Sequence, residues 1–133
     1  MQLYYSKILN ENDRIKDLRD VNVFYDSEGN LIFKCCDIND TAKKLYGDSG
    51  VEFYVTIEKS NLTKVAEIAG IFPKQNWFGS ILNLQRRKNE VDKISQDAIL
   101  NYFVSQYKND AECFQKIQHY LKAKKIKYKF EKW

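Results

Sequence analysis

The segment from Val51 to Glu58 alternates strictly between apolar and more polar side chains. Its apolar members are Val51, Phe53, Val55 and Ile57, and the residues between them are Glu52, Tyr54, Thr56 and Glu58. Successive side chains of a β-strand point to opposite faces of a sheet, so this pattern predicts a strand with one buried and one solvated side. Such strands are typical of antiparallel sheets that are covered on one face.

A β-hairpin is the clearest local signal before this strand. Two β-forming segments, residues 21–25 and 31–36, flank the sequence Asp26-Ser27-Glu28-Gly29-Asn30. Gly29 and Asn30 tolerate the positive φ that such a loop requires. We therefore expect these two segments to pair.

The two ends of the chain also have strand character. Residues 3–9 are rich in Leu, Tyr and Ile, and a charged connector follows them. The tail, residues 125–133, alternates again, with Ile126, Tyr128 and Phe130 on the expected buried side. Lysines on its other side are typical of an exposed sheet edge that is protected against pairing with another chain.

Helical spacing fills the regions between these strands. We expect a short helical turn over residues 41–45, a helix capped by Ser60 and ended by Gly70, and a surface loop over residues 71–79. Ser95 precedes another amphipathic segment. Asn109 and Glu112 have the spacing of a capping box before a further helix.

These elements predict an α+β fold, a mostly antiparallel sheet of about five strands packed on one face by three to four helices. The chain has 133 residues, five Gly and one Pro, without a flexible linker, which indicates a single domain over residues 1–133. No apolar stretch approaches the ~18 residues of a membrane span. The three cysteines do not indicate a disulfide framework, so we expect a cytoplasmic protein.

Cys35 and Cys36 are adjacent in an expected strand, so one should lie in the core and the other near the surface. His119 follows Cys113 by six residues, which places the two on different faces of one helix and excludes a two-ligand metal clip. A Cys–His nucleophilic pair formed in space stays open, but no hydrolase, phosphate-loop or dinucleotide motif accompanies it. We expect no enzymatic activity, no cofactor and no metal.

Charge divides the chain into two unlike halves. Residues 1–58 carry a net charge of −4 and residues 59–133 a net charge of +8. The acidic half suggests a patch that complements a basic protein partner. Its candidate partner-binding residues are Asp37, Asp40, Asp48, Glu52 and Glu58.

The basic half suggests a different partner. Arg86, Arg87 and Lys88, and the lysines of residues 122–132, lie near aromatic residues, as in proteins that bind nucleic acid through phosphate contacts and base stacking. The tail alternation turns its aromatics toward the core, which favours a solvated edge strand. A small nucleic-acid-binding domain remains the alternative function.

Three segments together resemble immunity proteins of bacterial contact-dependent growth inhibition systems, encoded beside polymorphic toxins. They are the hairpin turn at residues 26–31, residues 47–57, and the end of the last helix with the tail at residues 125–130. The resemblance implies a cytoplasmic, non-enzymatic inhibitor that binds the toxin domain of a sibling cell. A nuclease toxin would supply the basic surface. The family provides no functional residues to transfer, and the oligomeric state stays open.

Overall fold

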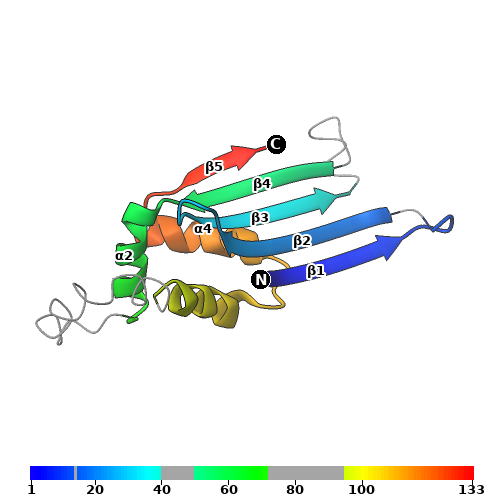
Figure 1. Cartoon of the computed structure of the whole chain (residues 1–133). Coiled ribbons are helices and arrows are strands. Elements are labelled where there is room, and N and C mark those ends of the chain that lie inside the picture. The colour runs from blue at the N-terminus through cyan, green and yellow to red at the C-terminus, as the bar shows by residue number, and fades with distance from the viewer. Residues whose placement is uncertain (14, 40–49, 72–94) are drawn as a thin grey trace, which may run out of the picture.

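The computed structural model describes residues 1–13, 15–39, 50–71 and 95–133. These residues form an α+β structure built on a five-stranded antiparallel sheet with the strand order β1-β2-β3-β4-β5. The strands are β1 (Gln2–Leu9), β2 (Ile15–Tyr25), β3 (Leu31–Ile38), β4 (Gly50–Ile57) and β5 (Lys129–Lys132). Figure 1 shows β1 and β5 at the two edges of the sheet, with the helices gathered beside it. The predicted α+β class and antiparallel sheet are confirmed.

The predicted hairpin is the β2–β3 pair, in register from Leu18 opposite Ile38 to Tyr25 opposite Leu31. Gly29 has a φ of 85° in its turn, as expected. Asn30 is absent from the residues with positive φ. It contributes its side chain instead, because its amide nitrogen donates to Oδ2 of Asp26 at 3.0 Å.

The charged connector expected after β1 is mostly strand. β2 begins at Ile15, and its first half pairs with β1 as far as Leu9 opposite Ile15. The polar composition misled the prediction, because residues 15–20 form a part of the strand in which every side chain is exposed or only partly buried. Two register shifts interrupt the β1–β2 ladder, one of them between Gln2 and Tyr4.

Three helices are present in the described residues: α2 (Lys59–Ile68), residues 95–107, and α4 (Cys113–Ala123). Gly70 ends α2 with a φ of 73°, as predicted. The predicted N-caps are wrong. Helix α2 already begins at Lys59, so Ser60 lies inside it, and α4 is preceded by a turn in which Asp110 Oδ1 accepts the Glu112 N–H at 2.9 Å. The expected helical turn at 41–45 and most of the expected loop at 71–79 lie outside the described residues.

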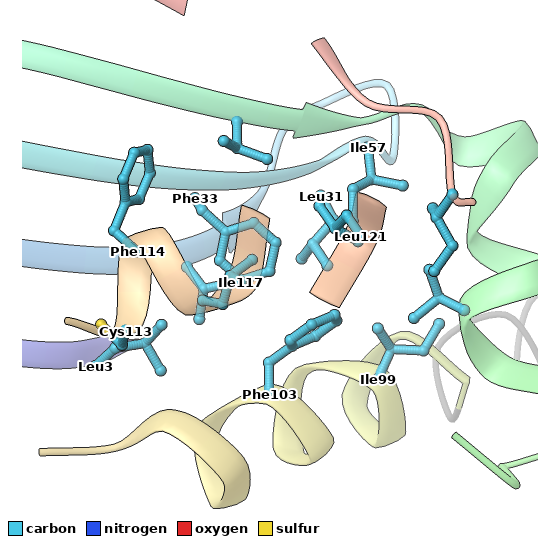
Figure 2. Close-up of a cluster of buried hydrophobic side chains, with 14 of the residues drawn as sticks. Leu3, Leu31, Phe33, Ile57, Ile99, Phe103, Cys113, Phe114, Ile117 and Leu121 are labelled. Carbon is cyan, nitrogen blue, oxygen red and sulfur yellow. The ribbon is translucent and has the colours of Figure 1, made fainter. Parts of the chain in front are cut away.

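The core combines side chains of the helices with strand residues that share one face of the sheet. Figure 2 shows Phe103, from the helix at residues 95–107, directed toward Phe33 of β3. Their ring centroids are 4.9 Å apart in an edge-to-face arrangement. We call this the inner face of the sheet. Its buried strand residues are Leu3, Val21, Val23, Leu31, Phe33, Cys35, Val51, Val55 and Ile57.

The final strand is shorter than the tail alternation predicts. Residues 126–128 are not part of a strand, and β5 covers only Lys129–Lys132. Ile126 is buried as expected, whereas Phe130 remains 51% exposed at the sheet edge. Phe130 stacks on Phe53 with a centroid distance of 5.9 Å, so it still contacts the inner face.

Candidate functional site

Three of the five predicted partner-binding residues lie in the described part of the chain: Asp37, Glu52 and Glu58. Asp40 and Asp48 lie outside it. Asp37 is opposite the buried Val51 in the β3–β4 ladder and belongs to the inner face, whereas the next pair, Cys36 and Glu52, points outward. Glu58 follows the other end of β4. The three carboxylates therefore do not form one patch.

Each of these three carboxylates also has a cationic neighbour. Arg19 Nε lies 3.5 Å from Oδ1 of Asp37, and Lys34 Nζ lies 3.7 Å from Oε1 of Glu52. Lys129 Nζ lies 2.9 Å from Oε1 of Glu58, and this contact holds the pKa of Glu58 below its usual value. The local charge is compensated at all three positions, which weakens simple attraction of a basic partner.

Asp37 occupies a half-buried polar site at the border of the core. Burial raises its pKa although Arg19 opposes the effect. The Arg19 guanidinium also donates to Oε1 of Gln115 on α4 at 2.9 Å. This arrangement joins the sheet to α4, and it indicates a structural contact between elements rather than an open docking point.

The cysteines lie as their spacing predicts. Cys35 is buried on the inner face, whereas Cys36 is only partly covered and its thiol lies 3.8 Å from Oε1 of Glu52. Burial raises the pKa of Cys35 to about 12 and that of Cys113 to about 11, so both thiols are protonated at neutral pH and are weak nucleophiles.

His119 is exposed on α4, whereas Cys113 on the same helix is buried, so the predicted separation of the two is confirmed. Across the described ranges, no three His, Cys, Asp or Glu side chains gather in a way that would hold a metal ion.

A group of polar and aromatic side chains lies on the opposite face of the sheet, which we call the outer face. The outer-face cluster consists of Lys34, Cys36, Glu52, Tyr54 and Trp133. The Tyr54 hydroxyl donates to Oε2 of Glu52 at 2.7 Å, which lowers the pKa of Glu52 and raises that of Tyr54. Lys34 Nζ lies 5.7 Å from the centroid of the Tyr54 ring. These contacts hold the Tyr54 ring and the Glu52 carboxylate in defined positions.

Trp133 is the most exposed member of the cluster. The main-chain N–H of Trp133 donates to the Glu52 carbonyl at 2.7 Å, and the main-chain carbonyl of Trp133 accepts the Glu52 N–H at 3.2 Å. Its ring meets Tyr54 edge to face at a centroid distance of 6.5 Å. Despite these contacts, 75% of the residue remains accessible. The main chain of Trp133 is thus fixed by hydrogen bonds, whereas most of the residue is exposed to solvent.

Glu52 is among the site residues predicted from the sequence, whereas Tyr54 and Trp133 are not. The alternation of residues 51–58 already places Glu52 and Tyr54 together on the solvated side. The position of Trp133 depends on the register between β4 and β5, in which Phe53 lies opposite Lys132. No local sequence pattern predicts which residues of β4 and β5 lie opposite each other.

The basic half of the chain presents exposed lysines at the end of α4 and just beyond it. They are Lys122, Lys124, Lys125 and Lys127, and none forms an ion pair with a described residue. Two of the neighbouring aromatics, Tyr120 and Tyr128, are partly buried and pack against the core, which limits the ring surface that they offer for stacking. Arg86, Arg87 and Lys88 lie outside the described residues.

Comparison of the chain with family models, with curated proteins and with solved structures finds no match. None of the helices in the described residues is both long enough and apolar enough to cross a membrane. Function is therefore inferred from the residues of the chain itself.

Proposed function

We propose that this protein is an immunity protein: a non-enzymatic inhibitor that binds a cognate bacterial toxin by protein–protein contact in the cytoplasm. The observation that carries the proposal is the held and exposed Trp133, beside Tyr54 and Glu52 on the outer face. Trp and Tyr dominate the binding energy of protein interfaces, and they do so most strongly when their positions are set before binding.

The two faces of the sheet differ in what contacts them. The helices contribute Phe103 and Phe114 to contacts with Phe33 and Phe53 of the inner face. The outer face instead carries the outer-face cluster. We propose that the helices cover the inner face alone, so that the outer face is the docking surface.

Within this surface, Glu52 supplies the polar contact. Its carboxylate already accepts the Tyr54 hydroxyl at 2.7 Å and is held ionised by that bond. A basic or hydrogen-bonding side chain of the toxin would meet this carboxylate while the toxin covers Trp133. Of the three acidic residues in the described part of the chain, Glu52 is thus the one whose position best supports a partner contact.

The test is protection of cells. The product of a neighbouring toxin gene is expressed alone and together with this protein, and growth is measured; we expect growth arrest in the first case and normal growth in the second. A neighbour that is harmless alone, or that arrests growth despite co-expression, contradicts the proposal for that pair.

A matched pair of variants locates the surface. Trp133→Ala should weaken toxin binding by more than about 10-fold, as is usual for an interface hot spot. Phe130→Ala is the matched control. Phe130 lies in the same edge strand, but its ring contacts Phe53 on the inner face, so this variant should change the affinity by less than about 3-fold. Affinities are measured by calorimetry, with urea unfolding as the control for folding. Equal effects of the two variants would reject the outer face as the binding surface.

A nucleic-acid-binding function is the second candidate, supported by four exposed lysines of residues 122–127 that form no ion pair with a described residue. They suit contacts to backbone phosphates, which give affinity without sequence preference. Binding of mixed RNA or DNA that falls steeply with salt, and that Lys124→Glu weakens, would favour this function. Binding that is absent at low salt would exclude it.

A further inference from the structure

The edge strand β1 has main-chain groups that face away from the sheet. The N-terminal amine of Met1 donates a hydrogen bond to the Val23 carbonyl at 2.7 Å, and the Val23 N–H donates to the Met1 carbonyl at 2.9 Å. Val23 of β2 therefore points toward β1, and so do Val21 and Arg19, because hydrogen-bonding directions alternate along a strand.

This alternation shows which residues of β1 face outward. Tyr4 and Ser6 lie opposite Val21 and Arg19 and bond inward, so Tyr5 and Lys7 present their N–H and carbonyl groups to the outside. Leu3 agrees with this assignment, because its carbonyl accepts the Asn109 N–H from outside the sheet at 2.8 Å. In the described part of the chain, no group bonds the outward side of Tyr5 or Lys7.

The two sheet edges differ in their protection. β5 has only four residues, and two of them are exposed lysines, Lys129 and Lys132. β1 has eight residues and one lysine, and exposed apolar side chains lie around the end of its hairpin: Ile8, Leu9 and Ile15. Natural sheets usually protect such an edge with charges, proline or a cover.

We propose that β1 pairs with β1 of a second copy of this chain, antiparallel and around a two-fold axis at Ser6. This register places Tyr5 opposite Lys7 of the second copy, and the outward groups of these residues then exchange four main-chain hydrogen bonds across the interface. It also places Tyr4 opposite Ile8 of the second copy. The contact is isologous, as two-fold interfaces require.

Self-complementarity distinguishes this register from its neighbours. An axis at Lys7 would place the two Lys7 ammonium groups directly opposite each other, which is unfavourable. An axis at Tyr5 would require the Leu3 carbonyl, which Asn109 already occupies. With the axis at Ser6, the four hydrogen bonds use only Tyr5 and Lys7, and the ladder ends before Leu3 would meet Leu9 of the second copy. This register also sets the Tyr5 ring beside Lys7 and the Tyr4 ring beside Ile8. A second copy of the chain is therefore the occupant that this edge fits.

The first test is sedimentation velocity of the whole protein over a wide concentration range. We expect a monomer–dimer equilibrium that shifts toward dimer with concentration. Lys7→Pro removes the outward N–H without removing a bond to β2, and should leave a monomer. Lys7→Val keeps the N–H and should still dimerise. A wild-type protein that remains monomeric at the highest concentration overturns the proposal.

The second test traps the register without depending on the proline variant. In a non-hydrogen-bonded antiparallel pair the two Cα atoms are about 4.5 Å apart, which lies within the range that a disulfide spans. Ser6→Cys should therefore form a disulfide-linked dimer on mild oxidation, seen by non-reducing electrophoresis. Tyr5→Cys, which faces Lys7 of the second copy, should form several-fold less. Equal trapping of the two variants, or none with Ser6→Cys, overturns this register.

Discussion

The side-chain oxygen of Asn30, in the β2–β3 turn, accepts the main-chain N–H of Lys59, the first residue of α2, at 2.9 Å. The residue at the N-cap position, Glu58, makes no side-chain capping bond. Asn30, which lies 29 positions before Lys59 in the chain, therefore caps the helix. The hairpin and the helix are coupled at this point.

Asn30→Ala should destabilise the protein by about 0.5–2 kcal/mol, the usual cost of removing a helix cap. The loss has two sources, the uncapped N–H of Lys59 and the lost contact with Asp26 in the turn. Urea unfolding followed by circular dichroism measures it. Glu58→Ala is the control and should have a small effect, because this side chain caps nothing and its ion pair with Lys129 is exposed. A larger loss for Glu58→Ala would contradict this capping role.

Asp26 should make stability depend on acid pH. Its carboxylate accepts main-chain N–H groups from Asn30 and Glu28, and these bonds lower its pKa. A lowered pKa means that the stabilisation is complete above the unfolded-state pKa of about 4 and disappears as the pH falls through the folded-state value.

Unfolding of wild type and Asp26→Asn is compared from neutral pH down to strongly acidic pH. The difference in unfolding free energy between the two proteins should be constant at neutral pH and should shrink below about pH 4. A difference that does not change with pH would show that the charge of Asp26 does not contribute.

Gly70→Ala should cost about 1 kcal/mol. Gly70 has a φ of 73°, and an added Cβ would meet no atom within 4 Å. The cost is therefore expected from the backbone conformation alone. Thermal unfolding measures it, and Ala69→Gly, at a residue with ordinary helical φ, separates the effect from a general change of helix propensity. No loss in Gly70→Ala would exclude the left-handed end of α2.

Lys125→Gly should stabilise the protein by about 0.5–1 kcal/mol. Lys125 has a φ of 56° at the end of α4, where the Ile126 N–H donates back to the Leu121 carbonyl at 2.9 Å. Glycine is the usual residue at this position of a helix end. Lys124→Gly, at a negative φ of −89°, is the control and should not stabilise. Differential scanning calorimetry compares the three proteins.

Phe103→Ala should destabilise the protein by about 3–5 kcal/mol, because it leaves a cavity under the sheet. Its ring is fully buried and contacts the rings of Phe33, Tyr107 and Tyr120. Phe130→Ala removes a ring of the same size that is half exposed, and should cost only about 1 kcal/mol. Similar losses for the two variants would contradict the assignment of Phe103 to the centre of the core.

Local patterns predicted most of the fold. The alternation of β4, the turn residues of the β2–β3 hairpin and the helical end at Gly70 are each determined by a few neighbouring residues, and all are present in the structure. At the start of α2 the prediction was wrong, because a distant residue performs the local capping role. Ser60 does not cap α2 because Asn30 reaches its first N–H.

The candidate site shows the same division. The sequence alone determined that Glu52 and Tyr54 share a solvated strand face, because side chains alternate along any strand. Only the tertiary structure decided that Trp133 lies beside them, that Asp37 lies on the opposite face paired with Arg19, and that Tyr5 and Lys7 face outward. These relationships depend on the register and order of strands that are far apart in the chain. Register is set by the joint packing of the core, which no single segment encodes.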